Sequence, residues 1–211
     1  MGMTKAVGIL GGTFDPVHNG HLRSALECLQ QFDFDHVRLI PSARPPHRTQ
    51  PQATPEQRMM MLHLAIKNSQ QFIVDDRELK REGASYTIDT LKSLKAEFPE
   101  TALYLILGTD ALNLLLTWHQ WQQLLDFCHI IVMQRAGAPL TLSDEMTSWY
   151  QAHLAKPEDK SLLAGSVWPV TLTQLTISAT TIRSDVTLGQ PPTFLTPDPV
   201  VSFIEQLKLY Q

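Results

Sequence analysis

Residues 11–21 have the sequence Gly-Gly-Thr-Phe-Asp-Pro-Val-His-Asn-Gly-His, which places paired glycines, a turn and two imidazoles in one short stretch. The residues before it, 6–10, form an apolar run that predicts a short buried β-strand. After it, apolar residues recur with the i, i+3, i+4, i+7 spacing of one helical face: Leu22, Ala25, Leu26 and Leu29. We therefore expect a strand-to-helix crossover here, the repeating unit of α/β proteins.

A crossover of this kind suits an anionic ligand, and phosphate above all. Gly11 and Gly12 let the backbone approach a ligand where a Cβ atom would intrude. The start of the following helix supplies unpaired N–H groups and the positive end of the helix dipole. The sequence therefore predicts a phosphate-binding site within residues 11–21.

His18 and His21 are the candidate chemical groups of this stretch. A single histidine is more often a structural residue, but two of them in a crossover that begins with paired glycines favour a shared cleft. Gly20 costs about 1 kcal/mol relative to alanine inside a helix, so we expect the helix to begin near His21. A zinc site is the weaker alternative, because the two cysteines, Cys28 and Cys128, lie in no ligand cluster.

Strand-like and helix-like segments alternate along the rest of the chain, without internal repeats. Strands are predicted at residues 36–41, 72–75, 103–107, 129–134 and 167–172. Helices are predicted from a capping box at Thr54 to about Lys67, from Ser85 or Thr87 to Phe98, from Ser178 to Gly189, and from Asp198 through Leu207. The alternation predicts a Rossmann-like, doubly wound parallel sheet with helices on both faces. We expect one domain over residues 1–211, with a surface insertion at about 136–160 and a C-terminal helical part at about 178–211.

The composition indicates a compact soluble protein. The chain has 211 residues and 43% hydrophobic content, enough for one sizeable core. Its net charge of −4 and the lack of a Lys/Arg cluster argue against a nucleic-acid partner. The apolar runs are far shorter than the roughly 20 residues that span a bilayer, and the first residues do not resemble a signal peptide, so no membrane partner is expected. Two widely separated cysteines favour a reducing cytoplasm.

A second cluster of anion-binding groups begins at Ser178. A hydroxyl at a helix start, a second hydroxyl at Thr180 and the guanidinium of Arg183 one turn later can together hold a triphosphate. The alternative for this segment alone is an ordinary serine N-cap followed by a solvated arginine.

Residues 11–21 resemble the His-x-Gly-His signature of a nucleotidyltransferase superfamily, and more narrowly that of the bacterial nicotinate-nucleotide adenylyltransferases. The second signature of these enzymes is matched by Ile-Ser-Ala-Thr-Thr-Ile-Arg at residues 177–183, in the expected order along the chain. The similarity extends over the whole length and includes residues 45–48, 85–87, 108–110, 134–137 and Trp118. The resemblance implies that residues 1–211 form a nucleotidyltransferase domain.

The resemblance implies adenylyl transfer from ATP to nicotinate mononucleotide, with pyrophosphate as the leaving group. His18 and His21 are then catalytic residues that donate hydrogen bonds to the α-phosphate. The implied ATP-binding residues are Gly11, Gly12, Thr13, Phe14, His18, His21, Ser178, Thr180 and Arg183. Magnesium is implied as a cofactor that is bound mainly through the ATP phosphates, so no dedicated metal ligands are expected.

The resemblance also implies where the second substrate binds. The implied residues are Arg48, Tyr86, Thr87, Gly108, Asp110, Trp118 and Arg135. A helix start at Tyr86 and Thr87 offers N–H groups to a carboxylate, and Trp118 offers a flat apolar face to a pyridine ring. Without the resemblance, the two arginines are equally well loop and strand-end residues, and the aspartate a helix N-cap. Ala136 stands where these enzymes often have proline, which leaves the placement of the preceding arginine open.

Three other functions compete. Sibling enzymes such as phosphopantetheine adenylyltransferase or a cytidylyltransferase share the first signature, but Tyr86, Thr87 and Trp118 favour the nicotinate enzyme. A class I aminoacyl-tRNA synthetase requires a Lys-Met-Ser-Lys-Ser loop that is missing here. A nucleotide-binding regulatory module without turnover has the same use for glycines and a helix start, and a pyrophosphate-release assay separates it from an enzyme. Nothing in the sequence specifies the oligomeric state.

Overall fold

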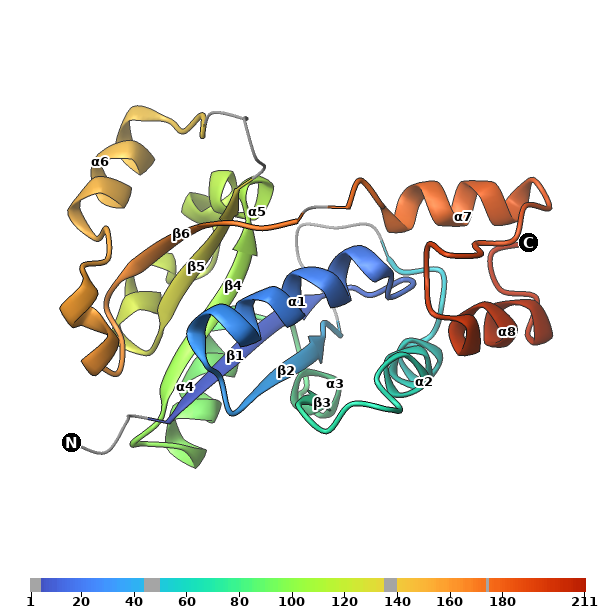
Figure 1. The fold of residues 1–211 in the computed structure, drawn as a ribbon, viewed down its shortest axis with the longest axis horizontal. Helices are drawn as coiled ribbons and strands as arrows, with labels where there is room; N and C mark the ends of the chain where they lie inside the picture. Colours follow the sequence, from blue (N-terminus) through green and yellow to red (C-terminus); the bar gives the residue numbers. More distant parts are fainter. Residues whose placement is uncertain (1–4, 44–49, 135–139, 174) are drawn as a thin grey trace.

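The computed structural model describes residues 5–43, 50–134, 140–173 and 175–211. Within these residues the chain forms one six-stranded sheet in the order β3-β2-β1-β4-β5-β6, with every neighbouring pair parallel (Figure 1). The strands are β1 (Ala6–Gly12), β2 (His36–Pro41), β3 (Phe72–Val74), β4 (Ala102–Gly108), β5 (His129–Gln134) and β6 (Val167–Thr171). The α-helices are α1 (Asn19–Phe32), α2 (Pro55–Ala65), α3 (Arg77–Lys80), α4 (Thr87–Glu97), α5 (Thr109–Asn113), α6 (Asp144–Ala152), α7 (Ala179–Thr187) and α8 (Asp198–Gln206). Short 3₁₀ helices lie at Leu115–Thr117, Trp121–Asp126 and Pro157–Ser161.

The strand order creates a switch point between β1 and β4. The chain moves outward from β1 through β2 to β3, and then returns to the other side of β1 for β4, β5 and β6. Sheets of this kind bind ligands outside the carboxyl ends of the strands, where the order reverses. The prediction of a Rossmann-like, doubly wound sheet is confirmed, and the strands predicted at 36–41 and 129–134 have the expected bounds.

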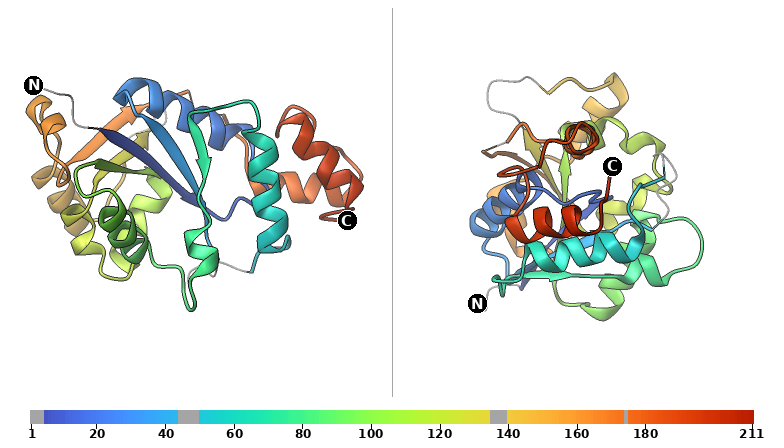
Figure 2. Two further views of the ribbon diagram at one scale, coloured as in Figure 1. Left: turned by 90° about the horizontal axis from the view of Figure 1, so that it is seen from below. Right: turned by 90° about the vertical axis from the view of Figure 1, so that its right-hand side faces the viewer.

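Each face of the sheet carries its own apolar core. In β4, Tyr104 and Ile106 contribute to the core shared with α1, α2, α7 and α8, while the alternating Leu103 and Leu105 contribute to the core shared with α4 and α6. Both faces of this strand are buried, which explains why its sequence is continuously apolar rather than alternating. In the views of Figures 1 and 2, α8 lies beside α2 at one end of the molecule, and α7 lies next to α8.

Three helix starts, those of α1, α4 and α8, differ from the prediction. Helix α1 begins at Asn19, two residues before His21, because His18 is itself the N-cap and Gly20 fits inside the first turn. An added Cβ at Gly20 would lie 3.0 Å from the His18 ring, so packing against that ring favours glycine here. Neither predicted residue caps α4: its N-cap is Tyr86 without a side-chain cap hydrogen bond, and the Ser85 hydroxyl instead accepts from the Ala43 N–H at 2.9 Å.

Other helix boundaries follow ordinary capping rules. Thr54 forms the predicted capping box with Gln57 at the start of α2, and Ser178 caps α7. Helix α8 begins at Asp198, so this residue lies inside the first turn rather than capping it. None of the helices within the described ranges is long and apolar enough to cross a membrane.

His129 is a fully buried histidine at the start of β5. Its Nδ1 accepts from the Ser166 N–H at 3.2 Å, so its Nε2–H donates to the Leu162 carbonyl at 3.1 Å. The ring stacks on Tyr104 with centroids 4.6 Å apart. Burial lowers the pKa of His129 below its ordinary value, and the ring is therefore neutral in the folded protein at neutral pH.

We expect the free energy of unfolding to fall as the pH drops below about 6.5, the ordinary pKa of histidine in an unfolded chain. Below this pH, His129 binds a proton in the unfolded chain but stays neutral in the folded protein. The stability that neutral His129 contributes above this pH is therefore lost as the pH falls. The contribution is at most about 1.4 kcal/mol per pH unit. Urea unfolding at pH 7.5 and 5.5 checks this: His129→Gln should be less stable at pH 7.5 and should lose less stability on acidification than the wild type. Equal losses in both proteins would contradict the assignment.

Candidate active site

The loop between β1 and α1 begins with a tight reversal at the carboxyl end of β1. Phe14 has a positive φ of 51° and folds its ring back under Gly12, where an added Cβ would lie 3.2 Å from that ring. The Phe14 side chain is buried in the core shared with α1 and α2. By contrast, an added Cβ at Gly11 or at Gly108, the last residue of β4, would meet nothing within 4 Å. Open space therefore lies beside both strands of the switch point.

His18 and His21 cap the start of α1 reciprocally. The His18 Nδ1 accepts from the His21 N–H at 3.4 Å, and the His21 Nδ1 accepts from the His18 N–H at 3.3 Å. The two rings stack with centroids 3.6 Å apart, and the Phe14 ring meets His21 edge-on at 5.0 Å. A ring whose Nδ1 accepts a hydrogen bond carries its proton on Nε2. The cap thus fixes the tautomer of both imidazoles and makes each Nε2 a donor.

His18 is only 6% exposed. Burial lowers the pKa of His18 to about 4, so in the ligand-free protein it is a neutral donor at neutral pH rather than a cation. A neutral ring is also what the cap requires, because protonation of Nδ1 would remove the acceptor for the His21 N–H.

Asp15 anchors the centre of the loop. Its buried carboxylate accepts from the N–H groups of Gln52 at 2.8 Å and Ala53 at 3.1 Å, and from the hydroxyl of Tyr210 at 2.8 Å. Its backbone carbonyl accepts from the Arg183 Nη1 at 2.7 Å. Three distant segments therefore converge on one residue of the loop.

Arg58 of α2 is a functional candidate that the sequence reasoning missed. It is completely buried, and its Nη1 donates to the carbonyls of Thr13 at 2.7 Å and Ser42 at 2.9 Å. These bonds join the loop to the end of β2. In the sequence, Arg58 stands one helical turn before Met61 and Leu62. An ordinary amphipathic helix has the same pattern, so the sequence alone does not single out this arginine.

The segment before α8 holds the other end of the loop. The Thr196 hydroxyl donates to the Val17 carbonyl at 2.8 Å, and the Asn19 N–H donates to the Leu195 carbonyl at 2.9 Å. The Asn19 side chain donates to the Phe194 carbonyl at 2.7 Å. The first residue of α1 is therefore fixed through both its backbone and its side chain.

The second signature lies at the start of α7 and reaches the same loop. Ser178 is an N-cap whose hydroxyl accepts from the Thr181 N–H at 3.1 Å and shares a hydrogen bond with the Thr181 hydroxyl at 2.8 Å. Thr180 is exposed. Arg183 contacts the loop through Asp15, and its Nε is buried without a hydrogen-bond partner in the described part of the chain. The fold thus brings together the two signatures.

The residues predicted for the second substrate lie in two places. Tyr86 and Thr87 form the start of α4, and the Tyr86 ring packs on His119 at 4.4 Å, next to Trp118. Gly108 and the exposed Asp110 lie at the carboxyl end of β4, where α5 begins. Arg48 and Arg135 lie outside the described residues.

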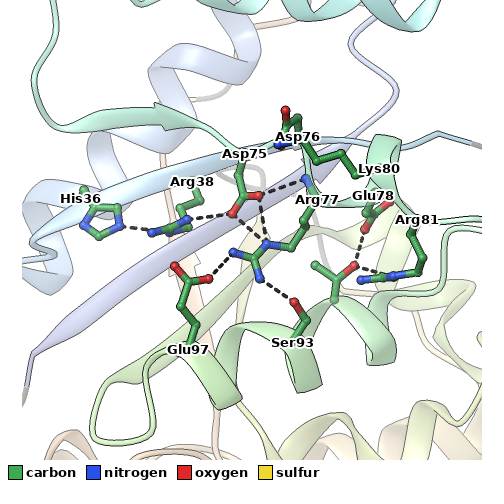
Figure 3. Close-up of polar contacts among 11 residues, drawn as sticks. His36, Arg38, Asp75, Asp76, Arg77, Glu78, Lys80, Arg81, Ser93 and Glu97 are labelled. Atoms are coloured by element: carbon green, nitrogen blue, oxygen red, sulfur yellow. Dashed lines mark hydrogen bonds and ion pairs between the residues drawn. The ribbon is translucent and has the colours of Figure 1, made fainter.

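A network of charged side chains fixes α3 against α4 (Figure 3). The Asp75 carboxylate accepts from Arg38 and from Arg77, each at 2.8 Å, and Arg77 also pairs with Glu97 of α4 at 2.8 Å. Burial alone would raise the pKa of Asp75, but the two guanidinium groups outweigh it and lower that pKa.

A buried acid extends this contact toward the start of α4. Glu78 accepts from the Thr90 hydroxyl at 2.7 Å, and Arg81 donates to the same hydroxyl at 3.3 Å (Figure 3). Burial raises the pKa of Glu78 above its ordinary value. The first turn of α4 is therefore held by Glu78 of α3 and by Arg81, which directly follows α3.

Within the ranges that the structure describes, no group of three or more His, Cys, Asp and Glu side chains is placed to hold a metal ion. Asp15, the carboxylate nearest to the histidine pair in sequence, already accepts three hydrogen bonds from the protein.

Comparison with known proteins gives matches over nearly the whole chain. The family described as cytidylyltransferase-like matches residues 9–185. The probable nicotinate-nucleotide adenylyltransferase of Pseudomonas syringae pv. tomato is 44% identical over 211 residues, which is 99% of this chain and 95% of that protein. The protein of the same name from Pseudomonas putida is 46% identical over 209 residues, covering 98% and 95% of the two chains.

The fold also matches a solved structure. The nicotinic acid mononucleotide adenylyltransferase of Plasmodium falciparum, solved in complex with NaAD, has a TM-score of 0.73 at 17% sequence identity, covering 98% of this chain and 97% of that one. At this identity the likeness shows a shared fold. Together with the family match and the curated relatives, the paired histidines and the second signature place this chain: it belongs to the nicotinate-nucleotide adenylyltransferases, within the cytidylyltransferase-like family.

Proposed function

We propose that this protein transfers the adenylyl group of ATP to nicotinate mononucleotide, forming nicotinate adenine dinucleotide and pyrophosphate, a step of NAD biosynthesis. The observation that carries the proposal is the reciprocal cap of His18 and His21 at the switch point of the sheet. It lies in a chain that is 44% identical to proteins named for this activity over almost its full length.

The reaction needs donors rather than a protein nucleophile. An oxygen of the mononucleotide 5′-phosphate attacks the α-phosphorus of ATP, the bond from the α-phosphorus to the bridging oxygen of the β-phosphate breaks, and pyrophosphate leaves with that electron pair. Charge on the α-phosphate oxygens is stabilised by groups that are oriented in advance. The Nε2–H groups of His18 and His21 are proposed to be these donors, and the cap that fixes both rings supports this.

The ATP phosphates are proposed to lie between the two signatures. Gly11 and Gly12 allow close approach of the backbone, and the N–H groups of Thr13 and Phe14 follow directly. Ser178, Thr180 and the first turn of α7 offer donors to the β- and γ-phosphates. Arg183 completes this set: one of its N–H groups holds the loop, and its buried Nε lacks a protein partner within the described residues, as does the Thr13 hydroxyl.

Nicotinate mononucleotide is proposed to bind across the start of α4 and the end of β4. The N–H groups of Tyr86 and Thr87 face the carboxylate, and Trp118 stacks on the pyridine ring. Gly108 lets the ribose approach the strand, and Asp110 accepts from a ribose hydroxyl. Arg48 and Arg135, as in the family, are proposed to hold the 5′-phosphate.

Magnesium is proposed to accompany ATP, held by phosphate oxygens and water. It neutralises charge on the departing pyrophosphate. We place the enzyme in the cytoplasm and propose a single catalytic domain over residues 1–211, with residues 136–160 as an insertion.

His21→Ala is expected to lower kcat about 100-fold to 1000-fold with a much smaller effect on the KM for ATP, because one preorganised donor to the transition state is lost. Pyrophosphate release measures this. His18→Ala should behave similarly. His63→Ala, at an exposed position on α2, is the matched control and should keep wild-type turnover. A fall of less than about fivefold in His21→Ala would exclude the catalytic role.

The enzyme is expected to prefer nicotinate mononucleotide to nicotinamide mononucleotide by at least about 100-fold in kcat/KM. Charge-assisted bonds to the carboxylate are each worth roughly 1.5 to 3 kcal/mol, and the amide leaves donors unpaired. Trp118→Ala should weaken both substrates alike, because stacking does not depend on the carboxylate. Comparable wild-type kcat/KM values for the two mononucleotides would refute recognition of the carboxylate by the start of α4. Loss of the preference in Trp118→Ala would instead assign the discrimination to Trp118.

Arg183→Ala is expected to raise the KM for ATP at least tenfold, because the loss of a charge-assisted donor costs roughly 1.5 to 3 kcal/mol. Arg183→Lys should recover only part of this loss, since an ammonium group can reach the Asp15 carbonyl but cannot reproduce the planar fork. Steady-state kinetics with circular dichroism checks both variants. An unchanged KM for ATP in Arg183→Ala would make the arginine purely structural.

A further inference from the structure

The last residues of the chain reach the loop that carries the histidines. Tyr210 is 8% exposed, and its hydroxyl donates to the Asp15 Oδ1 at 2.8 Å. Its backbone carbonyl accepts from the Thr187 hydroxyl of α7 at 2.8 Å. Tyr210 is therefore held by the helix of the second signature on one side and by the loop of the first on the other.

The hydroxyl of Tyr210 is a dependable donor in this position. Burial and the neighbouring Asp15 carboxylate both raise the pKa of Tyr210. Its hydroxyl therefore stays protonated at neutral pH. The phenol ring is packed in the core shared with α1, α2 and α8. Removing only the hydroxyl thus leaves the packing of the ring in place.

We propose that Tyr210 is a positioning residue for adenylyl transfer: through its hydrogen bond to Asp15 it sets the loop of residues 13–18 and, with it, the two histidine rings. The proposal rests on the proposed function. Tyr210 itself touches no reacting atom.

The loop is sensitive to this bond because Asp15 has few alternatives. Without the hydroxyl, Oδ1 keeps only the Ala53 N–H at 3.1 Å, and a buried carboxylate oxygen that has lost a donor is strongly destabilised. Among the described residues, Arg183 is the cation that pairs with this carboxylate, its Nη1 lying 4.0 Å from Oδ2. Rotation of the carboxylate toward Arg183 would pull on the bonds to Gln52 and Ala53 and shift the backbone that leads to His18. Misplacement of catalytic groups by about 1 Å can cost on the order of 100-fold in rate.

The test is Tyr210→Phe in the full chain, with Tyr104→Phe as the matched control. Tyr104 is also a buried tyrosine, but it lies in the middle of β4, away from the loop. Tyr210→Phe should lower kcat about tenfold to 100-fold while the KM for ATP changes less than about threefold, and Tyr104→Phe should keep wild-type kcat. A change of less than twofold in Tyr210→Phe, or equal losses in the two variants, would overturn the proposal.

A double-mutant cycle tests whether Tyr210 acts through Asp15 or only through the overall stability of the fold. Asp15→Ala removes the acceptor of the Tyr210 hydroxyl and should lower kcat at least as much as Tyr210→Phe, and the double variant should be no worse than Asp15→Ala alone, because the hydroxyl has then already lost its partner. Independent, multiplying losses would overturn the proposal. If Asp15→Ala does not fold, Thr187→Val, which removes the hydrogen bond to the Tyr210 carbonyl, replaces it in the cycle, and its loss should likewise not add to that of Tyr210→Phe.

Hydrogen exchange gives a readout that does not need turnover. Amides of residues 13–21 should exchange at least tenfold faster in Tyr210→Phe than in the wild type and be unchanged in Tyr104→Phe. An inactive wild type in which this difference persists would refute the proposed function and leave the coupling intact. Unchanged exchange in Tyr210→Phe would refute the coupling alone.

Discussion

A loop inside a protein must have its backbone polar groups paired, and the loop between β1 and α1 pairs three of its carbonyls with groups from outside itself. Its carbonyls at Thr13, Asp15 and Val17 accept from Arg58, Arg183 and a threonine before α8, respectively. The shape of the loop therefore depends on α2, α7 and the C-terminal segment as well as on its own cap at His18 and His21. The orientation of the histidine rings follows from that shape.

Local periodicity was enough to predict the sheet. The strands β2 and β5 are short apolar runs between turns, and the pattern located both of them to the residue. The helix starts were harder, because they depend on contacts that periodicity does not report. Histidine is an unusual N-cap, so the start of α1 was placed two residues late. The Ser85 hydroxyl bonds to Ala43 rather than capping α4, and this contact joins residues 42 positions apart.

The sequence predicted those residues of the candidate site that lie within the two signatures, and not the residues that support them. The two signatures identified His18, His21 and Ser178, and the fold brings their segments together. Arg58 and Tyr210 were missed because their partners lie 45 and 195 positions away, and neither has a local pattern that differs from ordinary core packing. The roles proposed for Tyr86 and its neighbours in substrate binding rest on family resemblance, because their local geometry alone does not indicate a substrate.

The contacts between the loop and residues 183–210 also fix when the site can form. Synthesis on the ribosome releases the N-terminal strands first, so β1 and its neighbours can pair while the later helices are still being made. The carbonyl of Asp15 and its carboxylate gain their last partners only when Arg183 and Tyr210 have left the ribosome. A nascent chain that has not yet reached these residues thus carries the histidines without two of the hydrogen bonds that hold their loop.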